Sequence, residues 1–256
     1  MLIMMAVWEL LAPRRQLQTP KVGRWLRNFG IVFIDVTVLR LLPSFSAIHI
    51  ASVVEKQGWG LLNHAPEAYL LKAIIGVIIL DLAIYLQHTA FHGLPILWRL
   101  HMMHHSDIDI DVTTGIRFHP IEILLSMGIK MLVVFLVGIS VLGVLIFEVL
   151  LNATSLFNHG NVRLGTSIDR ILRFFVVTPE MHRVHHSVII QETKSNFGFN
   201  LPWWDHLFGT YKGQPASGHL GMTIGLSQFR NPKELTLPKL LLLPFSGKTG
   251  NYPMGP

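Results

Sequence analysis

Cysteine is absent from the 256-residue chain, and charged residues make up only 14% of it. The lack of cysteine excludes disulfide frameworks, cysteine-ligated zinc, iron–sulfur clusters and cysteine nucleophiles, so any metal must be held by nitrogen or oxygen. Soluble domains carry about a quarter charged residues, whereas half of this chain is hydrophobic and its mean hydropathy is +0.46. These values predict an integral membrane protein.

Three apolar stretches are long enough to cross a bilayer, which takes about 20 residues of helix. They run from Ile31 to about Val54, from Tyr69 to about Phe91, and from Ile121 to Phe157. The last has 37 residues and is too long for one crossing, so we predict a hairpin that turns near Gly138 to Gly143. The expected fold is therefore all-α, with about four transmembrane helices in two hairpins.

The distribution of Lys and Arg predicts the orientation of these crossings. Five basic residues precede the first crossing, whereas the loop after it contains only Lys56, with Lys72 at its edge. Because cytoplasmic loops are enriched in Lys and Arg, the first side is expected to be cytoplasmic. Residues 161–256 return to that side and are expected to form a helical cap on a membrane domain of residues 1–160. The basic residues form no recognisable nucleic-acid module, so no nucleic-acid partner is expected.

Eight of the fourteen histidines fall into three clusters with helical spacing. These are a His-x3-His pair, His88 and His92, and two His-x2-His-His triplets, one formed by His101, His104 and His105 and the other by His182, His185 and His186. Residues at i, i+3 and i+4 share one helix face, so each cluster presents two or three imidazoles in one direction. Chance would produce two such triplets in this composition roughly once in a thousand chains.

All eight fall at the predicted cytoplasmic membrane surface, and His159 joins them where the last crossing ends. Nine neutral imidazoles exceed the three or four ligands of a zinc site, so two metal ions are the economical explanation. The Glu of His-Glu-x-x-His zinc proteases and the Glu-x-x-His signature of soluble di-iron bundles are missing. Nitrogen ligands alone suit iron, zinc or copper.

Further motifs accompany the histidines in a fixed order between about Asp81 and Tyr211. They are Trp98-Arg-Leu-His101, the segment from Thr114 to Glu122, and Asn196-Phe-Gly followed by the segment from Trp204 to Tyr211. This order resembles the fatty acid hydroxylase and sterol desaturase superfamily of membrane di-iron oxygenases. His206 departs from the pattern, because arginine is expected between Asp205 and the Leu-Phe-Gly-Thr that follows.

The resemblance implies a non-haem centre of two iron ions that uses O2 to hydroxylate or desaturate an unactivated C–H bond of a lipid, such as a fatty acyl chain or a sterol. It makes the protein an oxidoreductase whose two regions form one catalytic unit. The implied metal ligands are His88, His92, His101, His104, His105, His159, His182, His185 and His186. His119 is either a tenth ligand or a residue that orients the segment entering the third crossing.

The resemblance also implies a location and a partner. The histidine clusters would face the cytoplasm, from the inner membrane in a bacterium or the endoplasmic reticulum in a eukaryote. The sequence contains no flavin fingerprint, haem domain or Gly-x-Gly-x-x-Gly motif. A separate electron donor, a reductase, ferredoxin or cytochrome, is therefore expected.

Charged residues within the crossings have their own interpretations. Asp81 precedes His88 by two helical turns, so its carboxylate is expected either to accept an imidazole N–H or to make a helix-packing hydrogen bond. Lys130 and Glu148 lie symmetrically about the predicted hairpin turn, which indicates an ion pair. Asp35 and Arg40 in the first crossing are interpreted in the same way.

Two other functions stay open at this level. A zinc-dependent membrane hydrolase needs a general base beside the metal, and Glu180, two residues before His182, is the close candidate. A metal transporter or a non-catalytic metal-binding protein is the second alternative. Transporters place ionisable residues along a path at the bilayer midplane, whereas these histidines gather at one edge.

Overall fold

The computed structural model describes residues 1–66, 68–247 and 249–250, and its regular elements in this part of the chain are all helices. The α-helices are α1 (Leu2–Leu11), α2 (Lys21–Arg40), α3 (Ala47–Gln57), α4 (Tyr69–Gly93), α5 (Pro95–His105), α6 (Pro120–Val137), α7 (Val141–Asn158), α8 (Thr166–Leu172), α9 (Pro179–His185), α10 (Ile190–Thr193), α11 (Trp203–Leu207), α12 (Gly218–Gly221) and α13 (Leu237–Leu242). Four short 3₁₀ turns cover Leu61–His64, Thr114–Ile116, Pro232–Glu234 and Leu243–Phe245.

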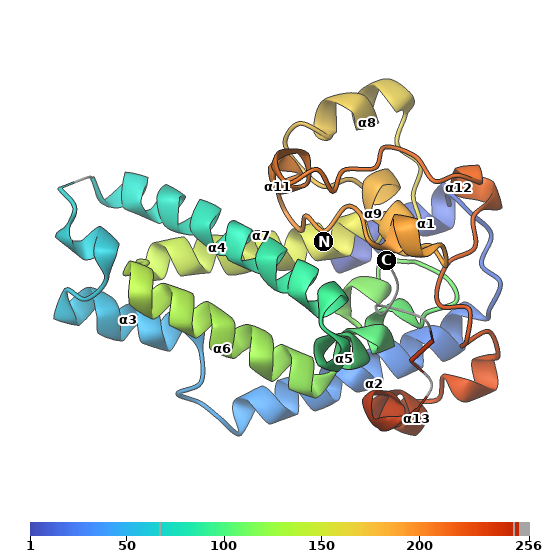
Figure 1. Ribbon diagram of the computed structural model, residues 1–256, viewed down its shortest axis with the longest axis horizontal. Coiled ribbons are helices and arrows are strands. Elements are labelled where there is room, and N and C mark those ends of the chain that lie inside the picture. Colours follow the sequence, from blue (N-terminus) through green and yellow to red (C-terminus); the bar gives the residue numbers. More distant parts are fainter. Residues whose placement is uncertain (67, 248, 251–256) are drawn as a thin grey trace.

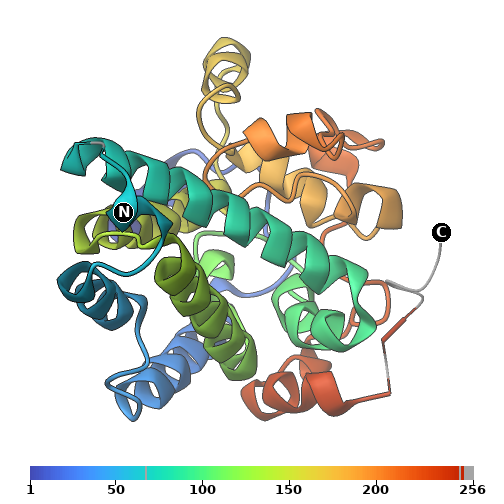
Figure 2. The same ribbon diagram turned by 60° about the vertical axis from the view of Figure 1, so that its left-hand side comes forward.

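The helices α4, α6 and α7 form the long part of the molecule. Of the described helices, these three are long and apolar enough to span a membrane. They run along the long axis in Figure 1, and α4 packs against both α6 and α7. Figure 1 shows the short helices α8 to α12 together at one end, with α10 and α12 packed against α9, and Figure 2 shows the orange helices of this group on the upper side of α4. The protein is therefore an apolar helical bundle with a loop-rich region at one end.

The first predicted crossing, Ile31 to Val54, is not a single helix. Its residues are divided between α2, which ends at Arg40, and α3, which begins at Ala47. Pro43 lies between them, and proline cannot supply the N–H that a continuous helix needs. Ser46 then starts α3 by accepting a hydrogen bond from the backbone N–H of His49. The break leaves α3 with 11 residues, which is too short to span a membrane, while α2 has 20 residues but contains five charged ones and is not apolar enough.

The predicted hairpin between α6 and α7 is confirmed. Gly138 ends α6 with a φ of 78°, a left-handed conformation that glycine adopts without steric cost. Ser140 then begins α7 by accepting a hydrogen bond from the N–H of Gly143. Because the two helices run antiparallel from this turn, Lys130 and Glu148 lie at the same depth, and their predicted ion pair is present with 2.5 Å between Nζ and Oε1.

The ion pair predicted between Asp35 and Arg40 is wrong. Residues five apart on a helix point in directions about 140° apart, so these side chains face different surroundings. Arg40 is exposed, whereas Asp35 is buried with only 7% of its surface accessible. Asp35 faces a cavity inside the bundle.

Candidate metal centre

The nine histidines expected to act together lie in two adjacent buried groups. The first group consists of His88, His92, His101, His105 and His185, and the second consists of His104, His159, His182 and His186. Within each group the candidate ligand nitrogens all lie within 4.8 Å of one another. No imidazole of the nine is more than 5% exposed. The residues present could therefore hold two metal ions side by side.

Helical spacing divides the two triplets between the groups. On α5, His101 and His105 are four residues apart and both belong to the first group, whereas His104 faces the second. On α9 the division is reversed, since only His185 belongs to the first group. The rings of His105 and His186 stack with their centroids 4.4 Å apart. The histidines of α5 and of α9 and its C-cap thus contribute to both groups, together with His88 and His92 of α4 and His159 at the end of α7.

The second group contains two imidazole nitrogens that face each other although neither carries a proton. Nδ1 of His104 lies 3.1 Å from the carbonyl oxygen of Arg117, and Nδ1 of His159 lies 2.8 Å from that of Ser155. A carbonyl only accepts, so each Nδ1 carries the proton and each neutral ring has a bare lone pair on Nε2. These two Nε2 atoms are 3.1 Å apart.

Two bare lone pairs at this separation repel each other unless a cation lies between them. Ligand nitrogens about 2.1 Å from a metal and at right angles are about 3.0 Å apart. The 2.9 Å between Nε2 of His159 and Nε2 of His182 matches this value as well. The second group therefore fits a metal ion.

The first group is fixed in the same way. Nδ1 of His88 donates to the carbonyl oxygen of Phe197, and Nδ1 of His185 donates to that of Ser195, both at 2.8 Å. The Nε2 atoms of His88, His101 and His185 are buried and have no hydrogen-bond partner in the described residues. Buried polar atoms are normally paired, so these nitrogens fit the ligands of a second ion.

Burial also keeps the imidazoles outside the long helices in their neutral, metal-binding form. Desolvation first, and then the neighbouring imidazoles, hold the pKa values of His104, His105, His182 and His186 well below the usual value. Burial lowers the pKa of His185 to about 3. These rings are unprotonated at neutral pH, as metal ligands must be.

Glu122 is a contributor to the site that the sequence analysis did not single out. It lies in the first turn of α6, and its Oε1 is 2.6 Å from Nδ1 of His101. A carboxylate that accepts the N–H of a ligating histidine fixes the orientation of the ring and raises its basicity. The sequence did contain a signal for this role, namely an acidic residue at the start of an apolar helix. An acidic side chain is costly in a membrane, and one that is retained there is usually functional.

His119 belongs to neither histidine group. Its Nδ1 accepts a hydrogen bond from the backbone N–H of Ile121, which caps α6, and its Nε2 donates to the carbonyl oxygen of Leu241 at 3.1 Å. Both ring nitrogens are thus used by the backbone. Of the two interpretations of His119, this geometry matches the one in which it orients α6.

Asp81 does not contact an imidazole. Its carboxylate accepts hydrogen bonds from the backbone N–H groups of Asn200 and Leu201 and from the indole N–H of Trp204, the last at 2.8 Å. These bonds hold the segment that also carries Phe197, whose carbonyl accepts from His88. Of the two contacts expected for Asp81, the hydrogen bond from an imidazole is absent among the described residues, and the carboxylate instead holds the segment whose Phe197 carbonyl accepts from His88.

The Trp-Asp-His motif stabilises the same segment. Asp205 accepts hydrogen bonds from the backbone N–H groups of Phe197 and Gly198, each at 2.8 Å, and from the hydroxyl of Thr210. His206 is exposed and stacks on Tyr211, with ring centroids 4.1 Å apart. The position at which the sequence departs from the expected pattern therefore lies outside both histidine groups.

The carboxylate of Glu180 lies close to two guanidinium groups and one imidazole. Its carboxylate lies 2.8 Å from Arg14, 3.0 Å from Arg183 and 2.9 Å from Nε2 of His219. Burial opposes its ionisation, but His219 and the two guanidinium groups outweigh burial and lower its pKa to about 2. A carboxylate so weakly basic is a poor general base, so the geometry does not favour the hydrolase alternative.

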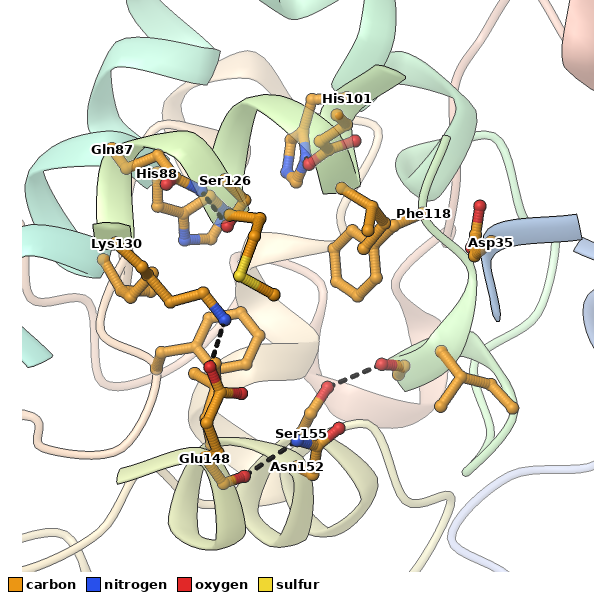
Figure 3. Close-up of a pocket in the computed structure, with 18 of the residues that line it drawn as sticks. Asp35, Gln87, His88, His101, Phe118, Ser126, Lys130, Glu148, Asn152 and Ser155 are labelled. Carbon is orange, nitrogen blue, oxygen red and sulfur yellow. Dashed lines mark hydrogen bonds and ion pairs between the residues drawn. The ribbon is translucent and has the colours of Figure 1, made fainter. Parts of the chain in front are cut away.

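An apolar cavity of about 330 Å³ adjoins the first histidine group (Figure 3). It is lined by α2, α4, α6 and α7, with His88 and His101 among its lining residues. Its walls are mostly aliphatic and aromatic, while Lys130 and Glu148 satisfy each other's charge within it. This size and lining are typical of a pocket for an apolar ligand, about 300 to 1,000 Å³.

These features define a membrane protein in which nine buried histidines that could hold metal ions lie beside an apolar cavity. Residues 73–210, which include all nine histidines, match the model of the fatty acid hydroxylase family. The chain therefore belongs to the fatty acid hydroxylase family.

Curated relatives are named for lipid oxidation. The chain is 32% identical over 155 residues to ornithine lipid hydroxylase OlsE of Rhizobium tropici, which covers 59% of this chain and 46% of the relative. It is 29% identical over 219 residues to alkylglycerol monooxygenase of Xenopus tropicalis, covering 81% of this chain and 46% of the relative. The chain thus spans about half the length of these relatives. No solved structure matches it.

Proposed function

We propose that the protein is a membrane oxygenase that uses two iron ions, O2 and two electrons to hydroxylate a C–H bond of a lipid. The observation that carries this proposal is the position of the two histidine groups next to an apolar cavity. The names of the relatives, a lipid hydroxylase and an alkylglycerol monooxygenase, support the same class of substrate and reaction. Desaturation, in which that carbon and its neighbour each lose one hydrogen and a double bond forms between them, is the second outcome of this chemistry.

Each histidine group would hold one iron. When bound, the irons supply the activation of O2 and the oxidising power of the reaction. The chain contributes fixed geometry, because the Nδ1 atoms of His88, His104, His159 and His185 are held by backbone carbonyls. Glu122 raises the basicity of His101, and the apolar cavity keeps water away from the reacting lipid.

The membrane arrangement follows from the same residues. We place α4, α6 and α7 across the bilayer, with α2 and α3 together forming a fourth passage. The histidine groups would face the cytoplasm, because Arg14, which contacts Glu180, and Arg24, which contacts Asp107, are at the same end of the molecule as these groups. Residues 1–160 and 161–256 then form one catalytic unit, since both contribute histidines to each group. A separate reductase, ferredoxin or cytochrome would deliver the electrons.

The proposal is tested by supplying the detergent-purified, iron-loaded protein with membrane lipids, a chemical reductant and ¹⁸O₂. A lipid carrying one ¹⁸O atom is the expected product, and a lipid lighter by two hydrogens would identify a desaturase. His88→Ala should abolish the product, whereas His49→Ala, which alters an exposed histidine on α3, should not. Oxidation that persists in His88→Ala would contradict the proposal.

A further inference from the structure

The apolar cavity contains one carboxylate that has no partner. Asp35, on α2, lines the cavity and is only 7% exposed. Its Oδ1 is buried and has no hydrogen-bond partner among the described residues. Figure 3 shows Asp35 well apart from the pair formed by Lys130 and Glu148. Asp35 is therefore a polar group of the cavity that is separate from this ion pair.

The other charged and amide side chains of the cavity each have at least one partner, although Oε1 of Gln87 and Oε2 of Glu122 are, like Oδ1 of Asp35, buried without one among the described residues. Lys130 is paired with Glu148, and the amide of Gln87 donates to the hydroxyl of Ser126 at 3.1 Å. Glu122 is hydrogen-bonded to His101. The charged neighbour whose field acts on Asp35 is Glu122, which is also a carboxylate. Among the described residues, the cavity therefore contains no free cation for Asp35.

A partnerless carboxyl group in such a place is unfavourable in either protonation state. The ionised form needs a cation or hydrogen-bond donors, and burying it without them costs several kcal/mol. The neutral form still has an oxygen that accepts a hydrogen bond. Buried ionisable residues within membrane helices usually serve a function with a defined partner. The missing partner is thus a hydrogen-bond donor, and the molecule that fills the cavity is its available source.

We propose that Asp35 binds a hydrogen-bond-donating group, an ammonium or a hydroxyl, of the lipid substrate. The same lipid would extend along the cavity toward His88 and His101. This inference rests on the proposed function and narrows its substrate to a polar lipid whose donor enters the cavity, in contrast to a plain hydrocarbon chain. Asp35 is then a determinant of substrate specificity that belongs to neither histidine group.

The test is a binding measurement that needs neither O2 nor a reductant. Native mass spectrometry of the purified protein would compare two lipids that differ only at one group, with a methyl replacing the ammonium or hydroxyl. The wild-type protein should retain the donor lipid at least about tenfold over its methyl counterpart, the range expected for one hydrogen bond to a charged group. Equal retention of the two lipids would overturn the proposal.

Substitutions of Asp35 test whether this residue causes the preference for the donor lipid. Asp35→Leu should bind both lipids equally, whereas Val32→Ala, on the same helix and lining the same cavity, should keep the preference. Asp35→Ala replaces Asp35→Leu if that variant does not fold, as judged by circular dichroism and gel filtration. A preference that survives in the apolar variants would overturn the proposal.

Asp35→Asn distinguishes the two donors, because the amide oxygen still accepts a hydrogen bond but carries no charge. A preference kept in this variant identifies a hydroxyl lipid, and a preference lost identifies an ammonium lipid. Failure of the proposed oxygenase function would give a different experimental result from failure of the Asp35 proposal. A protein that shows the Asp35-dependent preference but oxidises no lipid would reject the oxygenase and retain the binding site.

Discussion

Oε1 of Glu122 lies 2.6 Å from Nδ1 of His101, although the two residues are on different helices. The contact fixes which nitrogen of His101 carries the proton and leaves Nε2 directed at the first histidine group. Carboxylate support of this kind is conventional at metal-binding histidines. Glu122 therefore links the start of α6 to the proposed iron site.

Glu122→Gln should weaken metal binding in the first group by about 10- to 100-fold, because the neutral amide no longer raises the basicity of His101. The measurement is the iron retained per chain during titration with a chelator. Glu55→Gln is the matched control, since Glu55 is exposed on α3 and accepts only from the backbone of Val141. Equal iron retention in the two variants would refute this role.

Gly115→Ala should disturb the second group through packing alone. A Cβ at this position would lie 2.5 Å from the carbonyl oxygen of Ser155, the group that accepts from Nδ1 of His159. Overpacking of this kind costs about 1 to 3 kcal/mol, and we expect a lower melting temperature together with weaker binding of one iron. Gly93→Ala meets no atom within 4 Å and serves as the control. A Gly115→Ala protein with unchanged stability would contradict this packing.

The metal-free protein should lose stability as the pH falls below about 6.5. Burial depresses the pKa of folded His185 to about 3 and holds those of His104 and His182 well below the usual value. The unfolded chain then takes up protons that the folded chain cannot, so lower pH favours unfolding. The loss approaches about 1.4 kcal/mol per pH unit for each such histidine and continues down to the folded-state pKa.

Thermal unfolding of the metal-free protein between pH 5 and 8 checks this expectation. The midpoint should be nearly constant above pH 7.5 and should fall steeply below 6.5. Iron-loaded protein should hold its midpoint to lower pH, because bound metal competes with protons for the same nitrogens. A metal-free midpoint that does not change across this range would contradict neutral, buried imidazoles.

Features set by local spacing could be predicted from the sequence. The histidine triplets have the period of a helix, so their members share one face wherever the helix packs. Gly138 and the apolar run around it likewise define the α6–α7 hairpin, and the depth of Lys130 and Glu148 follows from the antiparallel geometry. These predictions depend on neighbours within one or two helices.

Features set by tertiary packing could not be predicted. Glu122 meets His101 because the connection between α5 and α6 is folded back on itself, with Arg24 of α2 bound to Asp107 and Asp111 at 2.9 and 2.8 Å. Asp81 lies on the expected side of α4, but a segment about 120 residues later reaches its carboxylate first. Helical spacing predicts the direction in which a side chain points. It does not predict which distant segment of the chain will pack against that side chain.

The central claim is that nine histidines hold two irons in two separate groups. The most direct test is the iron content of the purified, reconstituted protein, measured by mass spectrometry for the wild type, His185→Ala, His182→Ala and the exposed-site control His49→Ala. We predict about two irons per chain in the wild type and the control, and about one in each of the other variants. Less than about half an iron in the wild type, or a wild type with a single iron that both variants lose, would contradict the two-group centre.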